Sequence, residues 1–337
     1  MLAAAAVGWG VWRSANPAEP PLTRQQAVEQ LTELGGRFSA AVENHRDVRP
    51  MLAATRAIAE RFPDLRSAHQ LRGQIRAQLG ETEHAYDAFQ RALELDPHDA
   101  ELQNLAGTAA SLIGRPDDAQ THFLRATALD PDDARFRIRL GDTLLKAGRL
   151  DEAESEFTHA LTLRLMAHAA DAGLGDVYAA RARSSDDPDH RSDLLRRAIS
   201  HAETALGKLP DDDPASAAVR TVYARKLARH YHQRGDAVQA SAIVESLPEA
   251  DRFDPAVLAE LATYLDARGQ PVVAGLQYEL AARRDPTNPD LLAQGARWFR
   301  RAGDPDAARL LAERLVAGWP NHPAADELRE ESPPGRR

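Results

Sequence analysis

The feature that most constrains this chain is a sequence repeat with a period of 34 residues. The stretch FQRALELDPHDAELQNLAG, residues 89–107, recurs as FLRATALDPDDARFRIRLG at residues 123–141. Five columns hold one residue type over three successive copies. They are Gly73, Gly107 and Gly141; Gly80, Gly114 and Gly148; Ala85, Ala119 and Ala153; Phe89, Phe123 and Phe157; and Ala92, Ala126 and Ala160. A fixed period of this length predicts stacked repeats, in which each copy is one supersecondary unit.

Each copy has the pattern of a helix, a turn and a second helix. Gly80 marks the end of the first helix, because glycine adopts the left-handed conformation of a helix end at least cost. Acidic residues follow it, and carboxylates favour the positive end of the next helix dipole. Ala85, Phe89 and Ala92 fall at i, i+4 and i+7, on one face of the second helix. Pro97 then closes the copy, because it lacks an amide hydrogen and disfavours helix in the residue before it.

The repeat resembles the tetratricopeptide repeat family, whose 34-residue helix pair has small residues at positions 8 and 20, an aromatic at 24, alanine at 27 and proline at 32. Counted from Arg66, the matching residues of the first copy are Gly73, Ala85, Phe89, Ala92 and Pro97. The sequence departs from the family pattern at four places. These are Leu165 in place of the third proline, and His69, Gln103 and Arg137 in place of the position 4 aromatic. The resemblance implies an all-α fold, a right-handed α-α superhelix (solenoid) of stacked helix-turn-helix repeats.

The resemblance is clear over residues 66–167 and 255–322 and weaker between them. We expect residues 181–193 to lengthen the turn of the fourth copy, and residues 208–216 to hold most of the remaining insertion. The resulting organisation is 1–21, an apolar segment and Pro-rich linker; 22–65, a divergent helical repeat; 66–167, three well-matched repeats; 168–254, two divergent repeats with insertions; 255–322, two repeats; and 323–337, a C-terminal cap and tail.

Two local signals concern the first helix. Thr23 and Gln26 have the spacing of a capping box, in which each side chain satisfies a backbone amide of the helix start. Gly35-Gly36 lie further along the same segment, and we expect them to interrupt or bend it.

Composition excludes several classes of protein. Hydrophobic residues are 43% and charged residues 28% of the chain, which is typical of a folded protein rather than a disordered one. The net charge of −9 argues against nucleic acid as a partner, because that affinity rests on phosphate neutralisation. Without cysteine there is no disulfide, thiolate metal site or cysteine nucleophile. Only three of the 42 basic residues are lysines, so clusters of arginine are expected by composition alone.

The N-terminal segment MLAAAAVGWGVW, residues 1–12, is apolar up to Arg13. As a helix it reaches about 18 Å, short of the roughly 30 Å hydrocarbon core of a bilayer. We expect a single membrane anchor whose true start lies upstream of Met1, on a side of the membrane that the sequence leaves open. A cleaved export signal, giving a periplasmic or exported protein, and a buried helix of a soluble cytoplasmic protein are the alternatives.

The resemblance also implies a binding groove. In the family the first helix of each pair lines the concave face, chiefly through positions 2, 5, 9, 12 and 13. The candidates in the early copies are Gln70, Gln74, Asn104 and Thr108, with Gln78, Ser111, Asp142 and Lys146 beside them. Their amide side chains suit the backbone of an extended peptide, and the alternative is that they are merely solvated. The chaperone-tail clamp of the family needs lysine and asparagine where Gln70 and Gln74 stand, so we do not expect that site.

The later groove candidates are basic. They are Arg225, Arg229 and His232, at i, i+4 and i+7, and Arg297, Arg300 and Arg301, at i, i+3 and i+4. Each set faces one way on its helix and suits an acidic segment or a C-terminal carboxylate of a partner. The alternative is that these side chains are solvated or paired with neighbours such as Asp266.

We find no catalytic, cofactor-binding or metal-binding constellation. His230 and His232 lie two residues apart and point to different faces of a helix, and SSDDPDH at residues 184–190 lacks the spacing of a calcium loop. The sequence therefore indicates a non-catalytic scaffold of a bacterial-type membrane that binds a partner protein or peptide in its groove. An adaptor subunit, soluble or exported, that recruits substrates to a separate enzyme is the alternative, and a self-contained enzyme is disfavoured. Oligomeric state and the identity of the partner remain open.

Overall fold

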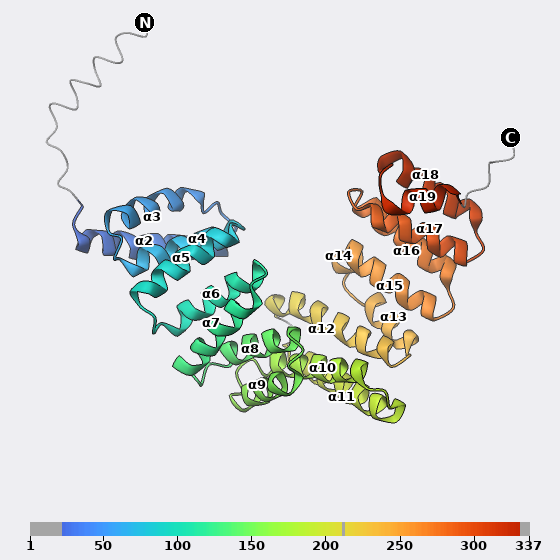
Figure 1. Ribbon diagram of the computed structural model, residues 1–337, viewed down its shortest axis with the longest axis horizontal. Coiled ribbons are helices and arrows are strands. Elements are labelled where there is room, and N and C mark those ends of the chain that lie inside the picture. Colours follow the sequence, from blue (N-terminus) through green and yellow to red (C-terminus); the bar gives the residue numbers. More distant parts are fainter. Residues whose placement is uncertain (1–21, 211–212, 331–337) are drawn as a thin grey trace, which may run out of the picture. The chain divides into compact units, whose positions relative to one another are not determined.

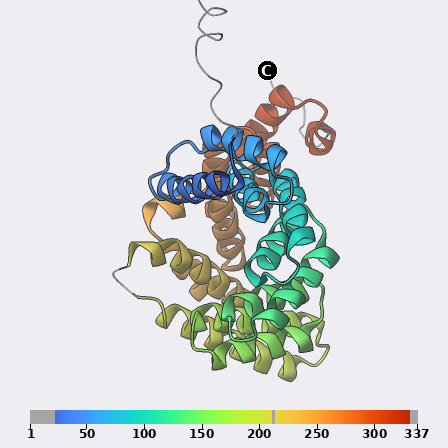
Figure 2. The same cartoon turned by 90° about the vertical axis from the view of Figure 1, so that its left-hand side faces the viewer.

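The computed structural model describes residues 22–210 and 213–330, and over these residues every regular element is an α-helix. The chain divides into two compact units, residues 1–132 and 133–337 (Figure 1). Unit 1 contains α2 (Arg24–Glu43), α3 (Arg49–Arg61), α4 (Arg66–Gln78), α5 (Thr82–Leu95), α6 (Ala100–Leu112) and α7 (Pro116–Leu129). Consecutive helices pack as antiparallel pairs, seen in the blue to teal ribbons of Figure 2. The expected all-α class of helix-turn-helix repeats is confirmed.

Unit 2 contains five further pairs, a one-turn helix and a closing helix. They are α8 (Ala134–Lys146), α9 (Leu150–Thr162), α10 (Ala167–Ser184), α11 (Pro188–Gly207), α12 (Pro214–Gln233), α13 (Ala237–Glu245), α14 (Glu249–Arg252), α15 (Pro255–Ala267), α16 (Pro271–Arg284), α17 (Pro289–Arg301), α18 (Pro305–Gly318) and α19 (Pro323–Glu330). The first helices of successive copies are α8, α10, α12, α15 and α17. Within unit 2, α8 contacts α10 and α10 contacts α12.

The turn inside most copies has the glycine geometry that the sequence predicts. Gly80, Gly114 and Gly148 have φ of 77°, 75° and 75°, in the left-handed region. In each case the amide of the next residue donates to the carbonyl five residues back, as from Glu81 to Arg76 at 2.9 Å. This bond satisfies a carbonyl that the helix end leaves open. The same bond, also at 2.9 Å, follows Gly235, Gly269 and Gly303.

The core of each well-matched copy is a phenylalanine packed on glycine. Phe89, Phe123 and Phe157 are all nearly or fully buried. A Cβ atom added at Gly73 would lie 2.5 Å from the Phe89 ring, and one at Gly107 would lie 2.8 Å from the Phe123 ring. The glycine column therefore exists because the ring occupies the space that a side chain would need.

Polar side chains replace the missing aromatic at position 4. His69 and Gln103 are buried and reach the carbonyl oxygens of Pro63 and Pro97, each at 3.0 Å. Gln103 also contacts His122 at 2.7 Å. Two equivalent pairs occur in unit 2. They are Arg137 with Glu156 at 3.1 Å and Asp171 with His201 at 3.0 Å. Each of these four position 4 side chains thus gains at least one partner on the second helix or on the preceding turn, although Nδ1 of His69 has none among the described residues.

Two expectations about local structure are wrong. α2 runs unbroken from Arg24 to Glu43, so Gly35 and Gly36 do not interrupt it. Its start has the Thr23–Gln26 capping box that the sequence predicts. Residues 181–193 do not form a long turn, since only residues 185–187 separate α10 from α11. The inserted residues extend the two helices instead, and Leu194 and Leu195 bury against Ala182.

The space around Gly35 in α2 gives a first prediction. No atom outside α2 lies within 4 Å of a Cβ added at Gly35. Gly35→Ala should therefore stabilise the protein by about 0.5–1 kcal/mol, because alanine loses less backbone entropy than glycine on forming helix. Urea denaturation followed by circular dichroism measures the change, and a lower midpoint than that of the wild type would contradict it.

Candidate partner-binding surface

The four early candidates lie on the first helices of unit 1. Gln70 and Gln74 are half-buried on α4, and neither makes a hydrogen bond to another described residue. Asn104 on α6 is buried and donates from Nδ2 to Glu101 at 3.3 Å. Its Oδ1 has no hydrogen-bond partner within the described part of the chain. Thr108 donates to the Asn104 carbonyl at 2.9 Å, so its hydroxyl is used within its own helix.

The first basic set converges on one carboxylate. Arg225 and Arg229 on α12 donate to the two oxygens of Glu260 on α15, each at 2.9 Å. The Tyr264 hydroxyl donates to the same carboxylate at 2.7 Å. Burial raises the pKa of Glu260, but the hydrogen bonds from Tyr264, Arg225 and Arg229 outweigh it and leave that pKa below its ordinary value. His232 packs its ring against Tyr264, with centroids 4.9 Å apart.

The second basic set is also paired within the chain. Arg297 on α17 donates two bonds, of 3.2 and 2.6 Å, to the Glu327 carboxylate on α19. Arg301 lies 3.5 Å from Asp266 and over the Trp298 ring, 4.4 Å from its centroid. Arg300 shares the last turn of α17 with Arg301. Arg225, Arg229, Arg297 and Arg301 thus have the internal partners that the sequence left as an alternative, and their contact with another protein stays a prediction.

These ion pairs belong to a regular ladder that sequence reasoning missed. The charged side chain at position 9 of one first helix pairs with position 5 or 6 of the next. The rungs are Asp176 with Lys226, Arg229 with Glu260, and Arg297 with Glu327. Opposite charges at these two positions of successive copies are the sequence signal for it. We call the residues of these three pairs, together with Asp142, the charge ladder of unit 2.

Asp142 is the residue of the charge ladder that has no oppositely charged partner on the next first helix. It stands at position 9 of α8, and Ala172 and Gly173 hold positions 5 and 6 of α10. The Asp142 side chain is exposed, and it makes no hydrogen bond or ion pair with any residue that the structure describes. Surrounding protein atoms raise the pKa of Asp142, and the charges of Lys226 and Lys146 oppose that rise without cancelling it. The carboxylate is accessible to solvent, and the surrounding protein atoms that the structure describes offer it no hydrogen-bond donor.

Buried polar residues lie beside this gap. Tyr223 on α12 contacts His168 on α10 at 3.0 Å through its hydroxyl. Burial, followed by the charges of Asp142 and Asp176, raises the pKa of Tyr223 to about 12. His230 is 3% exposed, and neither of its ring nitrogens has a hydrogen-bond partner among the described residues. Burial lowers the pKa of His230 to about 4, so its ring is neutral at physiological pH.

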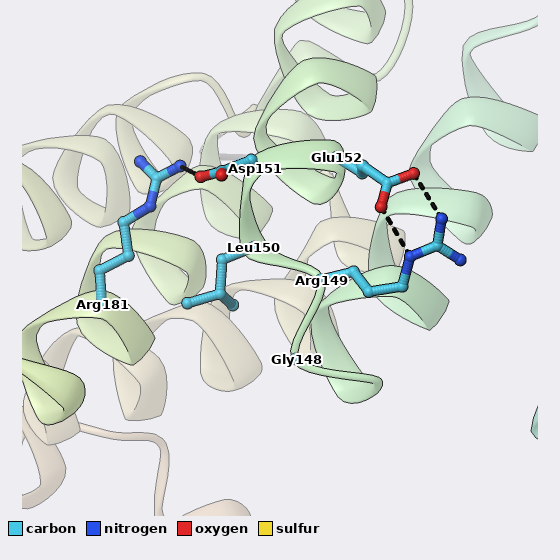
Figure 3. A pocket seen from close by; sticks show the side chains of 6 residues that line it. All are labelled: Gly148, Arg149, Leu150, Asp151, Glu152 and Arg181. Carbon is cyan, nitrogen blue, oxygen red and sulfur yellow. Dashed lines mark hydrogen bonds and ion pairs between the residues drawn. The ribbon is translucent and has the colours of Figure 1, made fainter.

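A separate hollow lies at the start of α9 (Figure 3). Gly148, Arg149, Leu150, Asp151, Glu152 and Arg181 line it. Arg149 donates to Glu152 at 2.6 Å, and Arg181 on α10 donates to Asp151 at 2.7 Å, as Figure 3 shows. Both carboxylates of the hollow, Asp151 and Glu152, are thus paired with an arginine. Over residues 22–210 and 213–330, no group of His, Asp or Glu is arranged to hold a metal ion.

Both units are stacks of antiparallel helix pairs, which defines the chain as an α-solenoid repeat protein. Residues 67–99, and residues 104–164 and 139–188, match models described as Tetratricopeptide repeat. These parts of the chain are tetratricopeptide repeats, as the resemblance implied. A comparison with curated proteins found no match. Proteins of this family generally act as scaffolds for protein–protein interaction.

Solved structures show the same fold at low sequence identity. A tetratricopeptide repeat protein from Parabacteroides merdae has a TM-score of 0.57 and 16% identity, covering 76% of this chain and 93% of that one. A thermophilic TPR protein of Thermus thermophilus has a TM-score of 0.50 and 21% identity, covering 60% and 99%. A chain of the APC/C hetero-tetramer Cut9-Hcn1 has a TM-score of 0.53 and 16% identity, covering 85% of this chain and 52% of that one.

The membrane anchor expected at residues 1–12 lies outside the described residues. Within the described part of the chain, no helix has both the length and the apolar character needed to cross a bilayer.

The shared carboxylate of Glu260 gives a second prediction. Glu260→Gln should cost about 1.5–3 kcal/mol near neutral pH, because a charged acceptor of three hydrogen bonds is lost. The pKa of Glu260 is depressed in the folded state, so its contribution is present above the unfolded pKa and is lost as pH falls through the folded value. The difference between the two proteins should therefore shrink below pH 4.5. Urea midpoints of the two proteins, taken near neutral pH and below pH 4.5, measure this difference in stability.

Glu60→Gln is the matched control for this prediction. Glu60 pairs with Arg56 one turn before it on α3, at 2.7 Å, and both side chains are exposed. A surface pair of this kind contributes about 0.3–0.5 kcal/mol. Equal losses in the two variants would show that Glu260 contributes no more to stability than a surface ion pair.

Proposed function

We propose that this protein is a non-catalytic scaffold whose first helices bind an extended segment of a partner protein. The observation that carries the proposal is that the first helices present accessible polar side chains that make no hydrogen bond within the described part of the chain. In unit 1 they are the half-buried Gln70 and Gln74 on α4, and in unit 2 it is the exposed Asp142 carboxylate on α8. The two amide side chains can both donate to and accept from the backbone of an extended segment.

A comparison of two faces of unit 1 tests the proposal. A photo-crosslinking amino acid is placed at Gln74, on the first helix α4, or at Asp87, exposed on the second helix α5. After irradiation in native cells, mass spectrometry should identify a discrete partner adduct at Gln74 and none at Asp87. Equal adducts at both positions would remove the first helices as the binding surface.

The acidic segment considered from the sequence meets competition within the chain. To reach Arg225, Arg229 or Arg297 it must displace Glu260 or Glu327, which already make two or more hydrogen bonds. Glu260 is also partly buried, so releasing it exposes two cations and leaves the Tyr264 hydroxyl unpaired. We therefore propose that these arginines order successive copies rather than hold the partner.

We also propose that residues 1–12 tether the protein to a membrane, on the basis of their apolar sequence. Expression of the natural gene, including any upstream coding sequence, should place the protein in an alkali-resistant membrane fraction. Deletion of residues 1–21 should move it to the soluble fraction. A soluble full-length protein with Met1 as its true start would leave the soluble or exported adaptor as the better description, and a co-purifying enzyme would support that adaptor.

A further inference from the structure

We propose that the partner places a lysine or arginine side chain on Asp142 and so completes the charge ladder of unit 2. This inference rests on the proposed function, in which the first helices bind a partner segment. It concerns one residue of that surface and the charge that this residue recognises.

The regularity of the ladder carries the inference. At each of the other charged position 9 residues, the next first helix supplies the opposite charge. The three pairs join Asp176 to Lys226, Arg229 to Glu260, and Arg297 to Glu327. At Asp142 the next helix supplies Ala172 and Gly173, and neither has a charged side chain. Among the charged position 9 residues of unit 2, Asp142 is therefore the one without a counter-charge from the described residues.

None of the described charged side chains around Asp142 pairs with it. Arg139 and Lys146 lie on the same helix, one turn before and one turn after it, and neither comes within ion-pair distance of the carboxylate. Lys226 is held by Asp176 on α10. His230 is neutral, and its Nε2 lies 3.6 Å from Asp176 rather than near enough to donate. No donor from the described part of the chain reaches the Asp142 oxygens.

The group that completes the charge ladder at Asp142 is a cation that donates hydrogen bonds. An ionised carboxylate only accepts, so it needs donors rather than another acceptor. A lysine or arginine side chain supplies both the donors and the charge, and such bonds are stronger than those of neutral donors. Because Asp142 is exposed, a partner side chain reaches it without displacing any internal contact.

Peptide selection on the whole protein tests this inference. The full chain is used to select from a displayed library of random short peptides, and the peptides that bind are synthesised with a photo-crosslinker and mapped by mass spectrometry. We expect peptides rich in lysine or arginine that crosslink to α8 or α10. Their affinity should fall about 10- to 100-fold with Asp142→Asn. It should stay unchanged with Glu313→Gln, which removes an exposed carboxylate from the second helix α18.

A charge exchange provides the stricter readout. Peptides in which the critical basic residue is changed to glutamate should lose binding to the wild type and recover it on Asp142→Lys. Asp142→Asn is nearly isosteric and exposed, and circular dichroism and thermal melting confirm that each variant is folded.

The outcomes separate the two levels of the proposal. Peptides that crosslink to the first helices but are acidic or neutral, or that bind Asp142→Asn as well as the wild type, would overturn the inference and leave the proposed function standing. If no selected peptide crosslinks to a first helix, the proposed function fails, and the role of Asp142 falls with it.

Discussion

Phe157→Ala should destabilise unit 2 by about 3–5 kcal/mol, the largest effect we expect from a single substitution in this chain. The side chain is fully buried, and its ring packs on Gly141 of α8 and on Gly173 of α10. Removing it leaves a cavity between two helices whose backbones cannot close without losing other contacts. Urea denaturation measured by tryptophan fluorescence and circular dichroism gives the change.

Leu165→Ala is the control, because Leu165 is a large apolar side chain that is 63% exposed. It should change stability by less than about 0.5 kcal/mol. Repeat proteins can unfold in parts, so both probes are needed to assign the loss to unit 2. A Phe157→Ala midpoint within error of the Leu165→Ala midpoint would remove the ring from its proposed role in the core.

Gly173→Val should destabilise unit 2 by about 3 kcal/mol, because it adds atoms to a filled core instead of removing them. A Cβ atom at Gly173 would lie 2.4 Å from the Phe157 ring, and the buried ring has no free space to move into. Overpacking of this kind usually costs about 1–3 kcal/mol or more. Gly35→Val in α2 is the matched control, because nothing outside α2 lies within 4 Å of its Cβ position.

The two substitutions should also be coupled. In Phe157→Ala the space beside Gly173 is empty, so a valine at that position meets no ring. The double variant should therefore be more stable than the sum of the two single losses predicts, by at least about 1 kcal/mol. Additive losses would mean that the valine and the ring do not share the same space.

The sequence predicts the parts of the fold that repeat within one copy. Gly80 and its equivalents gave the helix ends, and Phe89, Phe123 and Phe157 gave the core, because backbone geometry and packing fix those residue types. The helical structure of residues 181–193 was not predicted from the sequence. Their polar composition indicates a loop, but Leu194 and Leu195 pack on Ala182 and hold them in helices.

The candidate site was predicted less well, and the reason is physical. The positions of Arg229 and Arg297 on their helices follow from helical periodicity, but their partners Glu260 and Glu327 lie one copy further along the chain. Ion pairs of this kind join copies, so a pattern read within one copy does not contain them. For the same reason the unpaired state of Asp142 became visible only when successive first helices were compared.

The glycine turns have a consequence for how such a chain changes length. Their closing bond joins two backbone groups, so it places no demand on the side chain after the glycine, which is Glu81, Arg115 or Arg149 in three successive copies. A whole copy can therefore be duplicated or lost without redesigning its joint. The fourth copy lacks this glycine and turns through residues 185–187 instead, and its helices have 18 and 20 residues. The fifth copy keeps the turn at Gly235 although its helices α12 and α13 have 20 and 9 residues, so the same joint serves helices of unequal length.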